Sequence, residues 1–168
     1  AIAVMAKAST PGRTKTRLVP PLTPEQAAGL NTSFLRDVAD NLIAASAFAN
    51  ITPHMAYAPA GSAAFFESIL PQDVGLVETV APTLGECLLH AAATLLSEGH
   101  ASVCLLNADS PTLPVAYLVS AATALAVPGD RVAEAPALPG FGPAEEVAAA
   151  PGAGDGAASQ GGGDGVTA

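Results

Sequence analysis

A regular alternation of strand-like and helix-like segments over residues 1–127 is the feature that most constrains the fold. Four apolar runs have the length of strands, at residues 1–5, 51–58, 74–80 and 102–107. Stretches with helical periodicity follow them, at residues 24–42, 62–70, 84–95 and 114–125. Strands that alternate with helices are typical of βαβ units. The sequence therefore predicts an α/β fold, a mostly parallel sheet with helices on both faces and right-handed crossovers.

Two of the predicted helices begin with a capping box, Thr23-Pro24-Glu25-Gln26 and Thr83-Leu84-Gly85-Glu86. In a capping box the hydroxyl and the Gln or Glu side chain satisfy two backbone N–H groups that the first turn leaves without partners.

Pro53 stands at the start of the second strand. Because proline cannot donate to a sheet, it counts against a central position there.

The composition changes after residue 127. Residues 128–168 contain 10 Gly, 5 Pro and 11 Ala among 41 residues. So few large apolar side chains cannot offset the entropy of ordering the chain. We therefore predict one domain, residues 1–127, and a low-complexity tail, residues 128–168, that is disordered or read out of frame.

The net charge of −9 disfavours nucleic acid and anionic membranes as partners of the whole chain. No apolar run is long enough for a membrane span, and no signal peptide is visible. Two cysteines make no disulfide framework, so a cytoplasmic location is expected. Against the acidic trend, four of the six basic residues gather between residues 7 and 17.

This basic loop directly follows the first strand. Its cations are Lys7, Arg13, Lys15 and Arg17, and Gly12 lies among them. Ligands of open α/β sheets bind outside the carboxyl ends of the strands, and arginine pairs with phosphate through two parallel hydrogen bonds. The loop matches none of the standard phosphate motifs. It is interpreted as a phosphate-binding loop, with a merely solvated basic loop as the alternative.

Asp109 follows the fourth strand, again at a carboxyl end. Magnesium binds through one or two carboxylates together with substrate phosphates. Taken alone, Asp109 only caps a turn before Pro111, as aspartate often does. Taken with the basic loop, it is predicted to hold Mg²⁺ or Mn²⁺ that bridges a diphosphate.

Three segments carry a resemblance to a known family. Residues 4–18 resemble an opening motif of the form A-K-x-P-x-P-G-x-V-K-T-R-L, and residues 109–114 resemble a second motif, D-S-P-x-L-P. Residues 83–86 are similar to a weaker third block, D-L-G-E-R. Together they resemble a bacterial glycosyltransferase-like family, formerly a domain of unknown function (DUF2064), of the nucleotide-diphospho-sugar transferase superfamily.

The resemblance implies a Rossmann-like fold of the GT-A type and a metal-dependent, glycosyltransferase-like transferase. Its partners would be a nucleoside-diphosphate donor and an unknown small-molecule acceptor. It implies that Asp109 is the metal ligand. It also implies phosphate contacts for Lys7, Gly12, Arg13, Lys15 and Arg17.

Departures from the family pattern leave alternatives open. Asn107 stands where the family has glycine, and Cys87 replaces an arginine. After Val127 the expected next block is not recognisable, so the C-terminal part is interpreted as truncated or degenerate. The alternatives are a nucleotidyltransferase related to guanylyltransferases that act on phospholactate, and a truncated non-catalytic remnant that only binds nucleotide.

The histidines are weaker candidates. His54, His90 and His100 lie on separate predicted elements without the spacing of metal ligands. His90 falls near the apolar stripe of its helix, which predicts a partly buried side chain.

Overall fold

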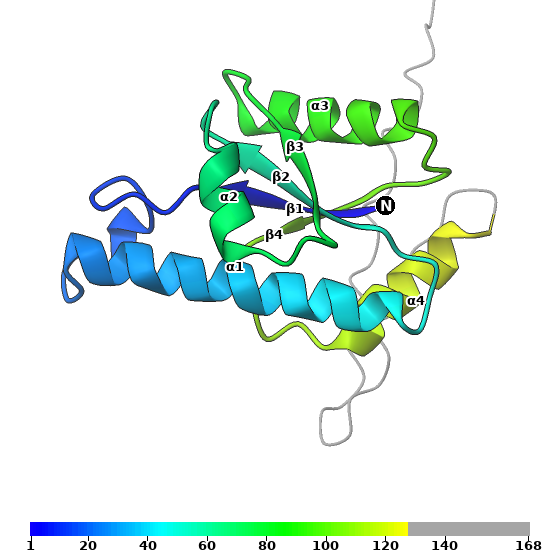
Figure 1. The fold of residues 1–168 in the computed structure, drawn as a ribbon, viewed down its shortest axis with the longest axis horizontal. Coiled ribbons are helices and arrows are strands. Elements are labelled where there is room, and N and C mark those ends of the chain that lie inside the picture. Colours follow the sequence, from blue (N-terminus) through cyan, green and yellow to red (C-terminus); the bar gives the residue numbers. More distant parts are fainter. Residues whose placement is uncertain (128–168) are drawn as a thin grey trace, which may run out of the picture. The chain divides into compact units, whose positions relative to one another are not determined.

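The computed structural model describes residues 1–127, which form a parallel four-stranded sheet with helices on both faces (Figure 1). The strands are β1 (Ile2–Lys7), β2 (Pro53–Ala58), β3 (Gly75–Glu78) and β4 (Cys104–Asn107). The helices are α1 (Pro24–Ser46), α2 (Ala63–Ile69), α3 (Leu84–Ser97) and α4 (Val115–Leu125), with a short 3₁₀ helix, η1 (Thr16–Leu18). The predicted α/β fold is confirmed. The segment 128–168, predicted to be a low-complexity tail, lies outside the described residues.

The strand order is β3-β2-β1-β4, and every pairing is parallel. Strand β2 lies between β3 and β1, so it is an interior strand, and the expectation drawn from Pro53 is wrong. Proline is tolerated here because it is the first residue of its strand. The N–H of Ile2 donates to the carbonyl of Thr52, one residue earlier, at 3.1 Å.

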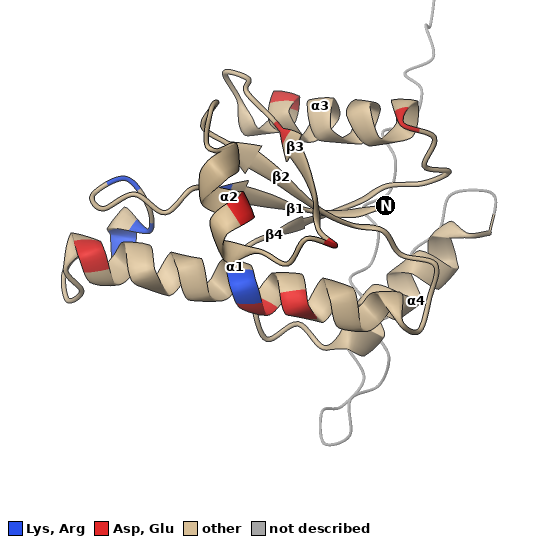
Figure 2. Cartoon of the chain, viewed as in Figure 1, with Lys and Arg blue, Asp and Glu red and all other residues tan. Residues whose placement is uncertain are grey.

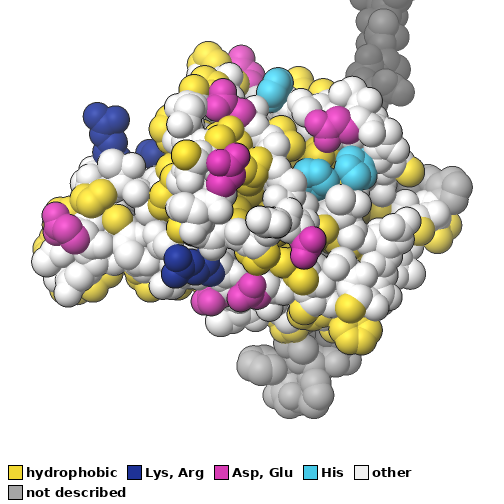
Figure 3. Space-filling model, viewed as in Figure 1, with side chains coloured by type: hydrophobic (Ala, Val, Ile, Leu, Met, Phe, Trp, Pro, Cys, Tyr) yellow, Lys and Arg dark blue, Asp and Glu magenta, His cyan; other side chains and the backbone are white. Residues whose placement is uncertain are grey.

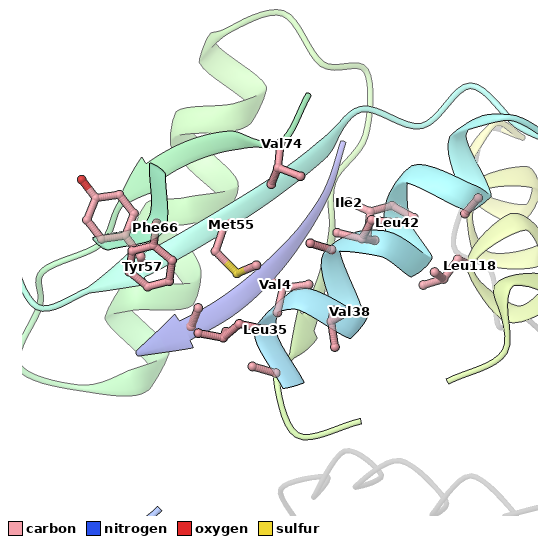
Figure 4. Close-up of a cluster of buried hydrophobic side chains, with 14 of the residues drawn as sticks. Ile2, Val4, Leu35, Val38, Leu42, Met55, Tyr57, Phe66, Val74 and Leu118 are labelled. Carbon is pink, nitrogen blue, oxygen red and sulfur yellow. The ribbon is translucent and has the colours of Figure 1, made fainter. Parts of the chain in front are cut away.

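Large side chains fill one face of the sheet. Side chains alternate between the two faces along a strand, so Val4 of β1 and Met55 of β2 point the same way. They pack against Leu35 and Leu42 of α1 and against Phe66 of α2, all fully buried (Figure 4). Leu118 of α4 joins this cluster. This face forms the larger part of the core.

The opposite face is covered by α3 and carries smaller residues. Ala3 and Ala56 pack with Ala91 and Leu95 of α3, and all four are fully buried. Alanines allow a helix to approach a sheet closely, which brings the end of α3 near the strands. His90, predicted to be partly buried, is instead exposed on α3, so that interpretation is wrong.

Both predicted capping boxes are present. The N–H of Gln26 donates to Thr23 Oγ1 at 3.2 Å, and the N–H of Thr23 donates to Gln26 Oε1 at 2.9 Å. Thr83 and Glu86 make the same exchange at the start of α3. Reciprocal caps fix where these helices begin.

The C-terminal end of α3 is a Schellman motif. Gly99 has φ +98°, a left-handed conformation that glycine adopts without steric cost. Its N–H donates to the carbonyl of Leu96 at 3.1 Å, and the N–H of His100 donates to that of Leu95 at 3.3 Å. The chain direction after α3 is therefore fixed.

In the described part of the chain, no helix combines the length and the hydrophobicity that crossing a membrane requires.

Candidate phosphate-binding site

The loop that joins β1 to α1 is organised by one buried hydroxyl. Thr14 is 4% exposed, and its Oγ1 donates to the carbonyl of Ala8 at 3.0 Å while accepting from the N–H of Thr10 at 3.1 Å. Gly12 turns the chain between these contacts with φ +72°. Hydrogen bonds to the Thr14 hydroxyl therefore hold the backbone of the basic loop in one conformation.

Helix α1 holds the start of this loop. Asn31, buried in α1, donates through Nδ2 to the carbonyl of Lys7 and to Ser9 Oγ, both at 3.0 Å. The hydroxyl of Thr32 donates to Ser9 Oγ at 2.8 Å. Sequence reasoning missed these supporting residues. The available signal was a pair of polar residues, Asn31-Thr32, beside the apolar stripe of a predicted helix.

Lys15 joins the basic loop to the segment after β4. Its Nζ lies 2.5 Å from Asp109 Oδ1 and 4.6 Å from the centroid of the Phe34 ring. The Lys15 side chain is 12% exposed, whereas that of Asp109 is 75% exposed. The two sequence motifs that predicted a site thus meet at the carboxyl edge of the sheet, with the carboxylate open to solvent.

Asn107 shapes the turn that presents Asp109. Its Oδ1 accepts from the N–H of Asp109 at 2.9 Å and from Ser110 Oγ at 3.2 Å. This is an Asx-type turn, in which the asparagine side chain replaces a backbone partner. The departure from the family's glycine therefore has a structural role here.

A cavity of about 230 Å³ opens beside this turn. Asn107 and Ser110 line it together with apolar side chains of α1, β4 and α4, among them Leu42, Leu106 and Leu118. Asn41 of α1 also lines the cavity, and its side chain donates to the carbonyl of Pro111 at 2.8 Å, which links α1 to the segment after β4. Most ligand pockets are apolar hollows with a few polar groups, and this one has that character.

The remaining predicted cations lie on the same loop as Lys15. Arg13 and Arg17 are exposed, and Arg17 is carried by η1. Lys7 Nζ donates to the carbonyl of Arg13 at 3.0 Å. Figure 2 shows basic residues gathered on this loop at the end of the sheet. One cation is thus paired and packed, and the others face solvent.

Comparison with known proteins identifies the family of this chain. Residues 41–146 match the family described as uncharacterized proteins conserved in bacteria, DUF2064. The chain belongs to this family. The match includes β4 and Asp109, and it begins after the basic loop, which the resemblance of residues 4–18 covers.

A solved structure resembles this DUF2064 protein. It is a crystal structure from Desulfovibrio desulfuricans G20 described as a "putative nucleotide-diphospho-sugar transferase". The two are 27% identical, with a TM-score of 0.65 over 73% of this chain and 52% of the other. The chain therefore spans about half the length of that structure. Among curated proteins, none matches.

Proposed function

We propose that this DUF2064 protein binds the diphosphate of a nucleoside-diphosphate sugar at the carboxyl ends of β1 and β4 and acts as a glycosyltransferase-like transferase. The observation that carries the proposal is the contact between Lys15 and Asp109, because it brings a basic loop and a lone exposed carboxylate to one edge of a parallel sheet. Open α/β sheets bind ligands at this edge. The similarity to the Desulfovibrio protein supports the same class of donor.

In this proposal the exposed cations bind phosphate oxygens. Arg13 and Arg17 present planar guanidinium groups that suit two-point contacts with phosphate, and Lys7 adds a point charge. Gly12 leaves open space where a side chain would stand, since nothing lies within 4 Å of the place of its absent Cβ. Phosphate can therefore approach the backbone of the turn closely.

A divalent cation, Mg²⁺ or Mn²⁺, fits Asp109 only together with a ligand. Within residues 1–127, Asp109 belongs to no cluster of three metal-ligating groups. Its carboxylate is exposed and would supply one oxygen, with phosphate and water completing the coordination, as magnesium commonly requires. The ion would supply charge neutralisation of the diphosphate. Lys15 holds the same carboxylate when no ligand is bound.

The chain's own contribution to the reaction is position and charge. The Thr14 and Asn31 hydrogen bonds fix the loop before ligand arrives, so little ordering is required on binding. The cations stabilise negative charge that grows on the leaving diphosphate. We propose that residues 1–127 form this donor-binding unit.

Calorimetric titration of the full chain with GDP and UDP, with and without Mn²⁺, tests the proposal. Arg13→Ala and Arg17→Ala should each weaken binding about tenfold or more, the effect of losing a charged hydrogen bond. Arg36→Ala, which removes an exposed arginine of α1 outside the loop, should leave binding unchanged. If neither nucleotide binds, or if Arg36→Ala weakens binding as much as Arg13→Ala, the proposal fails.

The metal role has its own comparison. Asp109→Asn should weaken nucleotide binding in the presence of Mn²⁺ and not in its absence, while Asp73→Asn, at an exposed aspartate before β3, should have no effect. Equal wild-type affinity with and without metal would contradict the role of Asp109.

Products distinguish the chemistries that share this donor site. Release of nucleoside diphosphate from a nucleotide sugar indicates glycosyl transfer, and release of pyrophosphate from a nucleoside triphosphate indicates nucleotidyl transfer. Nucleotide binding without either product indicates a binding remnant.

A further inference from the structure

A second group of ligand-type side chains lies toward the opposite end of the strands. One donor atom each from His54, Glu98 and His100 lies within 4.8 Å of the others. The two imidazole rings meet edge to face, with centroids 5.2 Å apart. Figure 3 shows histidine side chains next to each other on the face of the molecule that it displays. His54 is the second residue of β2, whereas Asp109 lies two residues beyond the last residue of β4.

The backbone sets the ring of His54. The side chain is 7% exposed, on the face of the sheet that α3 covers. Its Nδ1 lies 3.1 Å from the carbonyl oxygen of Thr52. A carbonyl only accepts, so Nδ1 carries a proton, and in the neutral ring Nε2 then keeps a free lone pair. Metal-bound histidines commonly donate their other ring nitrogen to such a carbonyl.

Gly75 leaves the space that this ring uses. It is the register partner of His54 in β3. A Cβ at position 75 would lie 2.5 Å from His54 Cδ2 and 2.8 Å from Nε2. Any residue other than glycine would therefore displace the ring from its present place.

The end of α3 supplies the other two groups. Glu98 is the C-cap residue and His100 is the first residue after Gly99 in the Schellman motif. The two hydrogen bonds of that motif fix the backbone of His100 relative to the end of α3. Glu98 is exposed, and its carboxylate can rotate toward the rings.

We propose that His54, Glu98 and His100 form a binding site for one divalent transition-metal ion, with Zn²⁺ the best fit. Two imidazoles and a carboxylate are a common ligand set for zinc, with water in the remaining position. Mg²⁺ prefers oxygen ligands alone, so it does not suit this set. The site is separate from the proposed donor site.

Closing the site needs a small movement. Zinc–ligand bonds of 2.0–2.1 Å in a tetrahedron place ligand atoms about 3.4 Å apart. The present separations of up to 4.8 Å therefore require side-chain shifts of little more than about 1 Å. A bound ion would join the end of α3 to β2.

Titration of the chelator-treated full chain with ZnCl₂ tests the site, by calorimetry and by thermal unfolding. We expect one equivalent to bind with saturation and the melting temperature to rise, because an ion that binds only the folded state stabilises it. MgCl₂ should do neither. Co²⁺ gives a second readout, since its visible absorption reports bonds to protein ligands.

Variants assign the ligands. His100→Ala and Glu98→Gln should each lose at least tenfold in zinc affinity, and Gly75→Ala should do so without removing any ligand. His90→Ala removes an exposed histidine of α3, and this variant should bind zinc as the wild type does. The double variant Cys87→Ser with Cys104→Ser should bind zinc as the wild type does, which would exclude the thiols as ligands. Asp109→Asn should also bind zinc unchanged, which would exclude the donor site as the place of zinc binding.

Four outcomes would overturn the site. They are no saturable zinc binding, unchanged affinity in His100→Ala, an equal loss in His90→Ala, and loss of binding in the cysteine-free variant. Nucleotide affinity is measured in the same His100→Ala protein, so that a misfolded chain is recognised. The donor-site proposal stands or falls on its own titration.

Discussion

Lys15 and Asp109, 94 residues apart in the sequence, form an ion pair with Nζ 2.5 Å from Oδ1. The pair is asymmetric, because the lysine is packed over Phe34 and the aspartate faces solvent. Each partner has a competing ligand in the proposed function. A phosphate would compete for the lysine, and a divalent cation would compete for the aspartate. In the absence of both, the two charges of the pair neutralise each other.

The asymmetry predicts unequal effects on stability. Lys15→Ala should lower the free energy of unfolding by about 1–2 kcal/mol, since it removes an ion pair, a cation–π contact and a packed stem. Asp109→Asn should cost less than about 1 kcal/mol because the pair is screened on its exposed side. Urea denaturation measures both.

Lys15→Met serves as the matched control for packing, since it keeps an unbranched stem over Phe34 and removes the charge. It should fall between the wild type and Lys15→Ala. A larger loss in Asp109→Asn than in Lys15→Ala would contradict the asymmetry.

Nucleotide binding should depend on salt. Arg13 and Arg17 are exposed, and the Debye length falls from about 10 Å at 0.1 M salt to about 3 Å at 1 M. We expect the dissociation constant for GDP or UDP to rise severalfold between 0.05 and 0.5 M NaCl. The double variant Arg13→Ala with Arg17→Ala should show a shallower dependence. An affinity indifferent to salt would argue against cation-mediated binding.

The capping box of α3 should be measurable in stability. Thr83→Ala removes the hydroxyl that accepts from Glu86 N–H, and such losses cost about 1 kcal/mol of unfolding free energy. Thr83→Ser keeps the acceptor and should stay close to the wild type. Chemical denaturation of the two variants gives the comparison, and equal stability of the two would contradict a role for the cap.

Cys104 should react slowly with alkylating reagents. Burial raises the pKa of its thiol, so at pH 8 a smaller fraction is thiolate than for an ordinary cysteine. In a Cys87→Ser background, iodoacetamide should modify the folded chain more slowly than the chain in urea. Mass spectrometry measures the rates. Equal rates in the two conditions would show that β4 does not protect this side chain.

Local chemistry made the elements of this fold predictable. The two capping boxes fixed the starts of α1 and α3, and the apolar runs located all four strands. Pro53 counts against an interior strand only within the body of a strand, and it is the first residue of β2, where proline is tolerated. The order of the strands is set by packing between distant segments, and no local pattern contains it.

The site was predictable in its parts and not in its contacts. The basic loop and Asp109 were found because both follow strands, whose carboxyl ends share one edge of a parallel sheet. The contact between Lys15 and Asp109 depends on the left-handed conformation of Lys15, with φ +49°, and on the Asn107 turn. His54 and His100 looked unrelated, because their meeting depends on strand register and on the end of α3.

The common direction of the strands also governs how two bound ligands would influence each other. Ala3, the register partner of His54, precedes Lys7 by four residues of β1, about 13 Å along the strand. Events so far apart contribute independently unless an intervening element has two arrangements. Nucleotide affinity should therefore be the same in zinc-free and zinc-saturated protein. A difference would be a coupling free energy, and the sheet between the two ends would be the element that moves.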